Sequence, residues 1–340
     1  MNTKSDPGLI IKGFDADVRQ AYTLWANQPV DQEMMDEAPE HLPSPLLTSL
    51  AKPVRVTGPG TFLGRATRTL SFEPSPRKGW WIDRIDQPDT MPIRVSIHDV
   101  WTTARNIVLC TGSPHNYLRM VEHIIALRLG LGVDNLLIRS DSGDPPLFDR
   151  GSMDLVEAIE GAGLVTEPEP ARYVTVSEPV TAAGPNGSFL TFLPAEGGSR
   201  ELIMDCAVDF ESAIGRQRIR FRVNRKTFRH GAFARTNTTL TRMLLARTIG
   251  KLFADLRNLG YTLDNILIAG PRRYLNAPRL LHNGRSLEAV WHRACLDLLA
   301  AIALIDRGRF AGTIISYKAG HTLDVQAIRE LYMRDLLRSL

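Results

Sequence analysis

The sequence has few cysteines and no long apolar run. Its three cysteines, Cys110, Cys206 and Cys295, are widely separated, so neither a disulfide framework nor a cysteine-based zinc knuckle is expected. The longest strongly apolar stretch, residues 298–305, falls far short of the roughly 20 residues that a membrane-spanning helix needs. The first 20 residues lack the basic and apolar segments of a secretory signal. We therefore expect a cytoplasmic protein.

The one segment where basic residues alternate with apolar ones lacks the interleaved stacking aromatics of a single-strand binder. Arg218, Arg220 and Arg222 alternate with Ile219, Phe221 and Val223, which predicts a strand with one basic face. Such a face meets either solvent or phosphate groups. Single-stranded nucleic acid is bound with stacking aromatics interleaved among the charges. None is arranged in that way, so we expect no nucleic-acid partner.

The length of 340 residues is typical of two domains. An acidic stretch and a proline-containing segment precede residue 50, and a second break falls at residues 167–171. A short helix is expected near residues 16–26. The predicted organisation is an N-terminal extension and linker over 1–50, α+β domains over 53–166 and 172–328, and a C-terminal tail over 329–340.

An internal repeat supports this division. Residues 129–138 read LGLGVDNLLI and residues 259–268 read LGYTLDNILI. Each copy follows a helix-like segment, the first with apolar residues at helical spacing over 118–129. Each precedes another helix candidate, at residues 151–162 and 286–305. The pattern predicts an α+β fold, a duplicated two-domain sandwich in which each half is a sheet packed against helices, with a site in the cleft between the halves.

The dipeptide Glu122-His123 is the first candidate for chemistry. Consecutive helical residues point about 100° apart, so both side chains can line one cleft. An imidazole that holds a metal beside a carboxylate that takes a proton from bound water suits hydrolysis. A surface ion pair at a helix end is the plainer interpretation.

His292 and Asp297 form a second candidate pair on the last long helix. Their spacing of five places them about 140° apart on a regular α-helix, against about 40° for a spacing of four. A one-residue π-bulge brings positions i and i+5 together, and such bulges concentrate at functional sites. Without a bulge, only one of the two easily reaches a metal.

Two further residues are candidates for proton transfer and charge stabilisation. His321 follows the strand candidate 312–316, at a loop position suited to a proton donor. Thr248, in the segment 246–250, has a hydroxyl that can stabilise an oxyanion. The plainer interpretations are an exposed loop histidine and a packed threonine.

Taken in order, these motifs resemble the UDP-3-O-acyl-N-acetylglucosamine deacetylase family, the zinc enzymes of lipid A synthesis, and the chain is identified as a divergent member. The resemblance runs from about residue 53 to residue 327. The matching segments are the glycine-rich hairpin 56–64, the Val-Glu-His and Asp-Asn motifs at 121–123 and 134–135, the turn 146–152, the Ala-Arg-Thr and Asp-Asn motifs at 246–250 and 264–265, and Tyr-Lys-Ala-Gly-His at 317–321.

The resemblance implies a role for each candidate residue. Glu122 is the general base, and His321 stabilises the tetrahedral intermediate or protonates the leaving amine. Thr248 stabilises the oxyanion, and Arg293 is a substrate-binding cation. The implied ligands of Zn²⁺ are His123, His292 and Asp297. The implied partner is a UDP-linked acylated amino sugar, whose acetamide is hydrolysed.

Departures from the family pattern leave a second function open. The family has its helical ligands four residues apart, whereas His292 and Asp297 are five apart. A further family carboxylate, which orients the catalytic histidine, becomes Ala301. These changes favour a non-catalytic or repurposed homologue, a ligand-binding or regulatory module, with an amidase for another acylated amine between the two. A π-bulge that brings both side chains near His123 favours an enzyme, and a straight helix favours the alternative.

Overall fold

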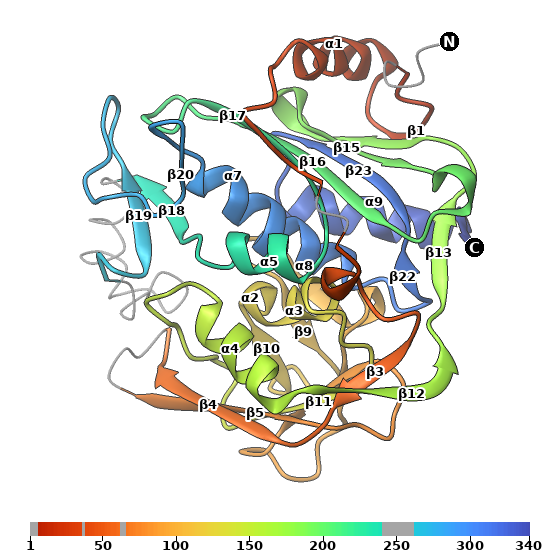
Figure 1. Cartoon of the computed structure of the whole chain (residues 1–340), viewed down its shortest axis with the longest axis vertical. Helices are drawn as coiled ribbons and strands as arrows, with labels where there is room; N and C mark the ends of the chain where they lie inside the picture. The colour runs from red at the N-terminus through yellow and green to blue at the C-terminus, as the bar shows by residue number, and fades with distance from the viewer. Residues whose placement is uncertain (1–5, 36–37, 62–65, 240–261) are drawn as a thin grey trace.

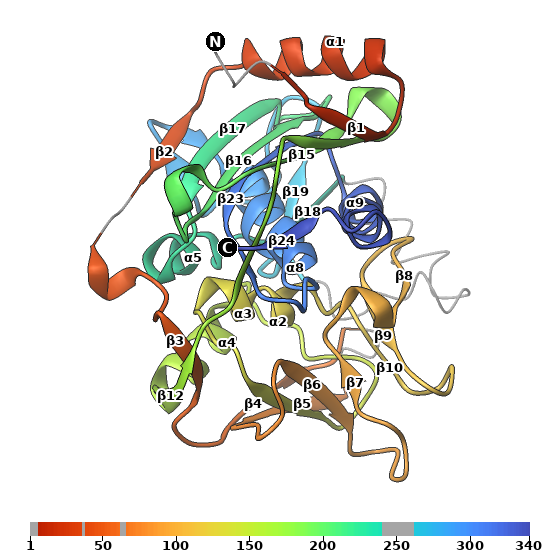
Figure 2. The same cartoon turned by 90° about the vertical axis from the view of Figure 1, so that its right-hand side faces the viewer.

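Two sheets enclose a layer of helices, as Figures 1 and 2 show for the computed structural model. The structure describes residues 6–35, 38–61, 66–239 and 262–340. One continuous apolar core runs through the helical layer and both sheets. The predicted α+β class, with sheets packed against helices, is confirmed.

The smaller sheet contains five strands in the order β4-β5-β11-β6-β7. Their bounds are Val54–Pro59, Thr67–Glu73, Leu136–Ser140, Trp80–Arg84 and Ile93–Arg94. The central strand β11 pairs antiparallel with β5 and parallel with β6. Every second residue of β11 and β6 is buried, as expected for strands with one face against a core. Helix α4 (Met153–Ala162) packs against β4.

The larger sheet contains seven strands in the order β1-β14-β15-β23-β16-β17-β2. Their bounds are Leu9–Lys12, Val180–Ala183, Phe189–Leu193, Gly312–Tyr317, Leu202–Asp209, Arg216–Arg222 and Gln32–Met34. Helix α1 (Asp15–Ala26) covers the outer face, where Tyr22 stacks on Phe189. The helical layer covers the inner face, so the central strands are apolar on both sides.

The helical layer carries the candidate site. Its members are α2 (Glu122–Ile125), α3 (Leu127–Gly130), α5 (Arg225–Gly231), α7 (Glu288–His292), the π-helical segment η8 (Arg293–Leu298) and α8 (Leu299–Ile302). Helix α9 (His321–Met333) packs beside α8, against β14 and β15. Glycine lets the helices approach closely, because a Cβ at Gly130 would overlap the Phe228 ring. Of the helices in the described residues, none is long and apolar enough to cross a bilayer.

Short strands complete the described fold. The pairs are β3 (Leu46–Leu50) with β12 (Leu164–Pro170), β18 (Thr236–Thr239) with β19 (Ile266–Ala269), and β20 (Leu281–His282) with β21 (Arg285–Ser286). Three-stranded ribbons join β10 (Tyr117–Arg119), β9 (Val108–Cys110) and β8 (Val100–Thr102), and β22 (Arg309–Phe310), β13 (Tyr173–Val176) and β24 (Leu337–Ser339). Single 3₁₀ turns are η2 (Pro39–His41), η3 (Ile97–Asp99), η4 (Pro185–Gly187) and η5 (Glu196–Gly198).

Both ends of the described chain are paired into sheets. In the segment predicted to be an extension and linker, β1 and β2 form the two edges of the larger sheet and β3 pairs with β12. In the predicted tail, α9 continues to residue 333 and β24 pairs with β13. The domain boundaries stay a prediction, but neither end hangs free of the sheets.

The local predictions had mixed outcomes. Helices over 15–26, 153–162 and 288–302 confirm those expected near 16–26, 151–162 and 286–305. The helix expected over 118–129 is wrong at its start, because Leu118 lies in β10 and Met120 has a φ of 51° that no α-helix contains. The two copies of the repeat begin strands of different sheets, β11 and β19.

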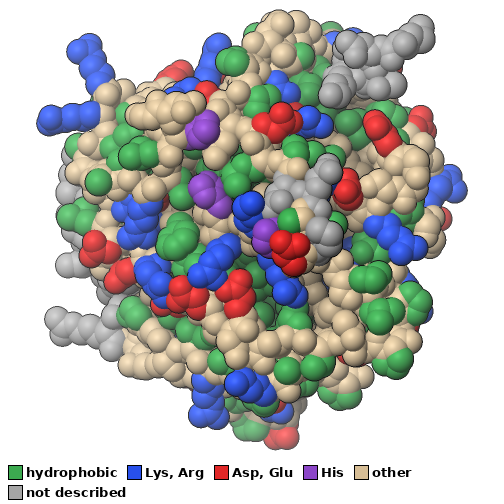
Figure 3. Space-filling model, in the orientation of Figure 1, with side chains coloured by type: hydrophobic (Ala, Val, Ile, Leu, Met, Phe, Trp, Pro, Cys, Tyr) green, Lys and Arg blue, Asp and Glu red, His purple; other side chains and the backbone are tan. Residues whose placement is uncertain are grey.

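The basic face predicted on β17 is neutralised within the molecule. The strand itself is confirmed, but its arginines meet carboxylates rather than solvent or phosphate. The three ion pairs are Arg218–Asp205, Arg220–Glu33 and Arg222–Glu201, at 2.8, 2.7 and 3.2 Å. Basic and acidic side chains are likewise interspersed over the face drawn in Figure 3.

Candidate active site

A turn with a left-handed residue places Glu122 and His123 in the interior of the molecule. The chain leaves β10 through Met120, whose left-handed backbone is rare outside glycine and typical of functional turns. Glu122 begins α2 with only 3% of its surface exposed. Its Oε1 accepts a hydrogen bond from the Ile107 amide. Burial raises the pKa of Glu122, and His321 opposes the rise in part.

Ser152 holds the ring of His123. The Ser152 Oγ lies 3.1 Å from His123 Nδ1 and donates to the His123 carbonyl at 3.3 Å. The other ring nitrogen, Nε2, lies 3.4 Å from Nε2 of His292. Burial, with His292 adding to it, lowers the pKa of His123 to about 3. The ring is therefore neutral, and its Nε2 lone pair is free for a ligand bond.

Of the two geometries left open for the helix that carries His292 and Asp297, the structure has the π-bulge. Residues 293–298 form the π-helical segment η8, between α7 and α8. The wider turn places Asp297 Oδ2 3.5 Å from His292 Nδ1 despite the spacing of five. Burial opposes ionisation of Asp297, but His292 and His321 outweigh it and hold its pKa well below the usual range. Asp297 is therefore a carboxylate.

His321 closes the cluster from the opposite side. It is the first residue of α9, after a loop in which Lys318 has a φ of 53°. Its Nε2 lies 3.6 Å from Asp297 Oδ1 and 3.7 Å from Glu122 Oε1. Burial opposes protonation, but Asp297 and Glu122 prevail and raise the pKa of His321. The raised pKa favours the protonated form of His321, which faces two acidic side chains.

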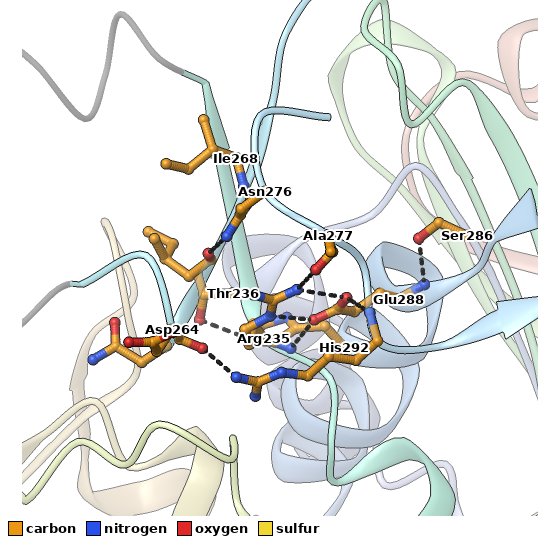
Figure 4. A network of polar contacts seen from close by, with 12 residues as sticks. Arg235, Thr236, Asp264, Ile268, Asn276, Ala277, Ser286, Glu288 and His292 are labelled. Carbon is orange, nitrogen blue, oxygen red and sulfur yellow. Dashed lines mark hydrogen bonds and ion pairs between the residues drawn. The ribbon is translucent and has the colours of Figure 1, made fainter. Parts of the chain in front are cut away.

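Thr236 is a site residue that the sequence analysis missed. Its Oγ1 lies 3.0 Å from His292 Nε2. The preceding Arg235 is bound at Nε and Nη2 by both oxygens of the fully buried Glu288, one helical turn before His292 (Figure 4). This ion pair fixes the start of β18 against α7. The signal was available, because Ala-Arg-Thr occurs at 234–236 as well as at 246–248.

Of the predicted site residues that the structure describes, Arg293 is not brought into the cluster. Arg293, expected to bind substrate, is 6% exposed and donates to Asp324 Oδ1 at 2.6 Å and to the Ala319 carbonyl at 2.9 Å. Its guanidinium is committed to the protein interior, so the geometry does not support a substrate contact. Thr248 lies outside the described residues.

Comparison with known proteins gives the family. The sequence profile of the UDP-3-O-acyl N-acetylglycosamine deacetylases matches residues 48–333. The chain belongs to this family. UDP-3-O-acyl-N-acetylglucosamine deacetylases of Brucella ovis and Brucella abortus are each 28% identical to it over 287 residues, covering 83% of this chain and 94% of theirs.

The cluster around His123 and His292 contains donors suited to zinc. Within the ranges that the structure describes, no three metal-binding side chains converge on one point. The two Nε2 atoms of His123 and His292 do fit a shared ion, since nitrogens 2.0–2.1 Å from a tetrahedral zinc are about 3.3–3.4 Å apart. Asp297 supplies a carboxylate beside the His292 ring, and two histidines with one carboxylate are a typical catalytic zinc set. The residues present therefore fit zinc.

Proposed function

We propose that this chain is a zinc-dependent deacetylase that hydrolyses the acetamide of a UDP-3-O-acyl-N-acetylglucosamine-type sugar nucleotide, a step of lipid A biosynthesis. Family membership and the names of the relatives support the reaction and the substrate class. The observation that carries the proposal is the meeting of Glu122, His123, His292, Asp297 and His321 from three separate helices. Neighbouring side chains of this cluster lie 3.4–3.7 Å apart, so acidic, basic and metal-binding groups face the same small space.

The metal is expected on His123, His292 and Asp297. A zinc ion so held supplies Lewis-acid polarisation of a carbonyl and lowers the pKa of a bound water. The protein orients these ligands itself, because Ser152 fixes the ring of His123 and the π-helical turn brings Asp297 beside His292. Such supporting contacts raise metal affinity and fix the ligand tautomers.

Glu122 and His321 divide the proton transfers. Oε1 of Glu122 accepts a proton from the water that attacks the acetamide carbon, a role that its raised pKa favours. Nε2 of His321 donates a proton to the departing amine as the C–N bond breaks. Thr236 Oγ1 donates a hydrogen bond to the oxygen on which negative charge develops. Water is thereby added across the amide, and the products are acetate and a free 2-amino group.

This geometry removes the main support for the alternative function, a ligand-binding or regulatory module. That alternative rested on the extra residue between His292 and Asp297, and the π-helical segment η8 accommodates that residue. Ala301 remains a departure from the family, fully buried in α8. It removes a carboxylate without removing any residue of the cluster.

Metal analysis combined with turnover tests the proposal. Protein purified without added metal or chelator is expected to contain about one zinc per chain and to release acetate from UDP-3-O-acyl-N-acetylglucosamine. The Glu122→Gln variant keeps the shape and the Ile107 contact of the side chain but not its basicity. It should lose about 10²–10⁴-fold in kcat with zinc retained. A protein without zinc after reconstitution, or a variant with unchanged turnover, contradicts the proposal.

A further inference from the structure

Arg293 connects three elements around the loop that precedes His321. It lies in η8, directly after His292. Its Nη2 donates to Ser316 Oγ on β23 at 3.3 Å and to Asp324 Oδ1 on α9 at 2.6 Å. Its Nε donates to the carbonyl of Ala319, in the loop between that strand and that helix, at 2.9 Å. One guanidinium thus holds both ends and the middle of the segment.

The His321 side chain depends on this segment for its position. In the described part of the chain, its Nδ1 has no hydrogen-bond partner. The two contacts of Nε2, at 3.6 and 3.7 Å, are longer than hydrogen bonds. The ring is therefore placed by its backbone, which begins α9 where Asp324 N bonds to the Gly320 carbonyl.

The buried charges make this arrangement specific. The Arg293 and Asp324 side chains are 8% and 0% exposed. A buried ion pair needs good geometry and additional hydrogen bonds; Nε and Nη2 of Arg293 have such bonds, whereas Nη1 and the Asp324 Oδ2 have no partner among the described residues. Arginine also differs from lysine here, because only a planar fork donates in several fixed directions at once.

We propose that Arg293 is a positioning residue that clamps the 318–320 loop and thereby places His321 against Glu122 and Asp297. This inference rests on the proposed deacetylase function and gives Arg293 a role other than binding substrate. The contacts of Arg293 also connect the metal-binding part of the site with its proton donor. The residue that follows the metal-binding His292 sets the position of the proton donor.

The test is Arg293→Lys, which keeps the charge and loses the fork. With zinc-loaded protein and UDP-3-O-acyl-N-acetylglucosamine, kcat is expected to fall about 10–100-fold. KM should stay within about twofold, and zinc content should not change. Arg218→Lys is the matched control, because Arg218 is another buried arginine with a forked Asp205 partner and backbone acceptors, on the outer side of the larger sheet. It should lose comparable stability and keep its kcat.

Crystal structures of the wild type and Arg293→Lys give a readout that needs no turnover. The ring of His321 is expected to move by about 1 Å or more relative to Asp297. If the wild type is inactive, the proposed function fails while this displacement still decides the clamp. If Arg293→Lys does not fold, Asp324→Asn, which keeps the shape and one acceptor, replaces it in the same measurements. An increased KM with unchanged kcat, an undisplaced ring, or an equal loss of kcat in Arg218→Lys overturns the inference.

Discussion

Thr236 and Thr248 each end an Ala-Arg-Thr tripeptide, and each is a candidate for the hydrogen-bond donor to the oxyanion. Substituting them one at a time shows which of the two has this role. Motif matching favours Thr248, which lies outside the described residues, whereas the hydroxyl of Thr236 lies 3.0 Å from His292 Nε2. Thr236→Val and Thr248→Val each remove one hydroxyl with little change of shape. We expect only Thr236→Val to impair the reaction strongly.

The structure separates the catalytic cost of Thr236→Val from its cost in stability. Loss of one donor to a developing oxyanion raises the barrier by about 2.7–4 kcal/mol, a decrease of about 10²–10³ in kcat. The hydroxyl is half-buried and its hydrogen bond is to His292, so its removal lowers the free energy of unfolding by about 0.5–1.5 kcal/mol. A shift of about 2–4 °C in Tm per kcal/mol is too small to explain the loss of rate at 25 °C.

Steady-state kinetics on zinc-loaded protein measures both variants. The expected result is a decrease of at least about 100-fold in kcat for Thr236→Val, with zinc content unchanged. Thr248→Val serves as the control of identical chemistry. A large loss in Thr248→Val with a nearly normal Thr236→Val would refute the reasoning from geometry and restore the motif match.

Three further substitutions test the surroundings of the site. Ser152→Ala removes the contact to His123 Nδ1 and should weaken zinc affinity about 10–100-fold in a chelator competition; unchanged affinity would mean that the ring is held otherwise. Glu288→Ala leaves Arg235 buried without its carboxylate and should lower the free energy of urea unfolding by about 3–5 kcal/mol, and a loss below 1 kcal/mol contradicts that. Gly130→Ala forces a methyl group into a buried ring and should cost about 1–3 kcal/mol in the same experiment; a stabilised variant would show that the helices separate easily.

Much of the site was predictable because its residues lie in ordered local motifs. Glu122-His123, His292 and His321 each stand at a helix start or end, and the family pattern places them in sequence order. Asp297 was predictable only as one of two alternatives, because a spacing of five suits a metal pair in a π-helical turn and not in a regular helix. Periodicity cannot choose between them, since the choice depends on what packs around the helix.

The errors arose where a distant segment decides the environment of a side chain. Periodicity identified β17 correctly, but Arg218 is buried because its guanidinium pairs with Asp205 on β16 and Trp25 of α1 covers it. Met120 interrupts an apolar pattern that reads as one helix, because the turn into α2 has a left-handed residue. Trp25 is far from Arg218 in the chain, and the left-handed backbone of Met120 leaves no mark in the apolar pattern.

The sequence by itself determined the α+β class and the family, and it indicated Glu122, His123, His292 and His321 as candidates, because these follow from apolar periodicity and from short motifs in fixed order. Only the tertiary structure showed that Thr236 reaches His292, that Arg293 pairs with Asp324, and that Asp297 joins the histidines. Each of these depends on contacts between elements far apart in the chain. A side chain's partner is set by packing and charge pairing across the core, which local spacing does not encode.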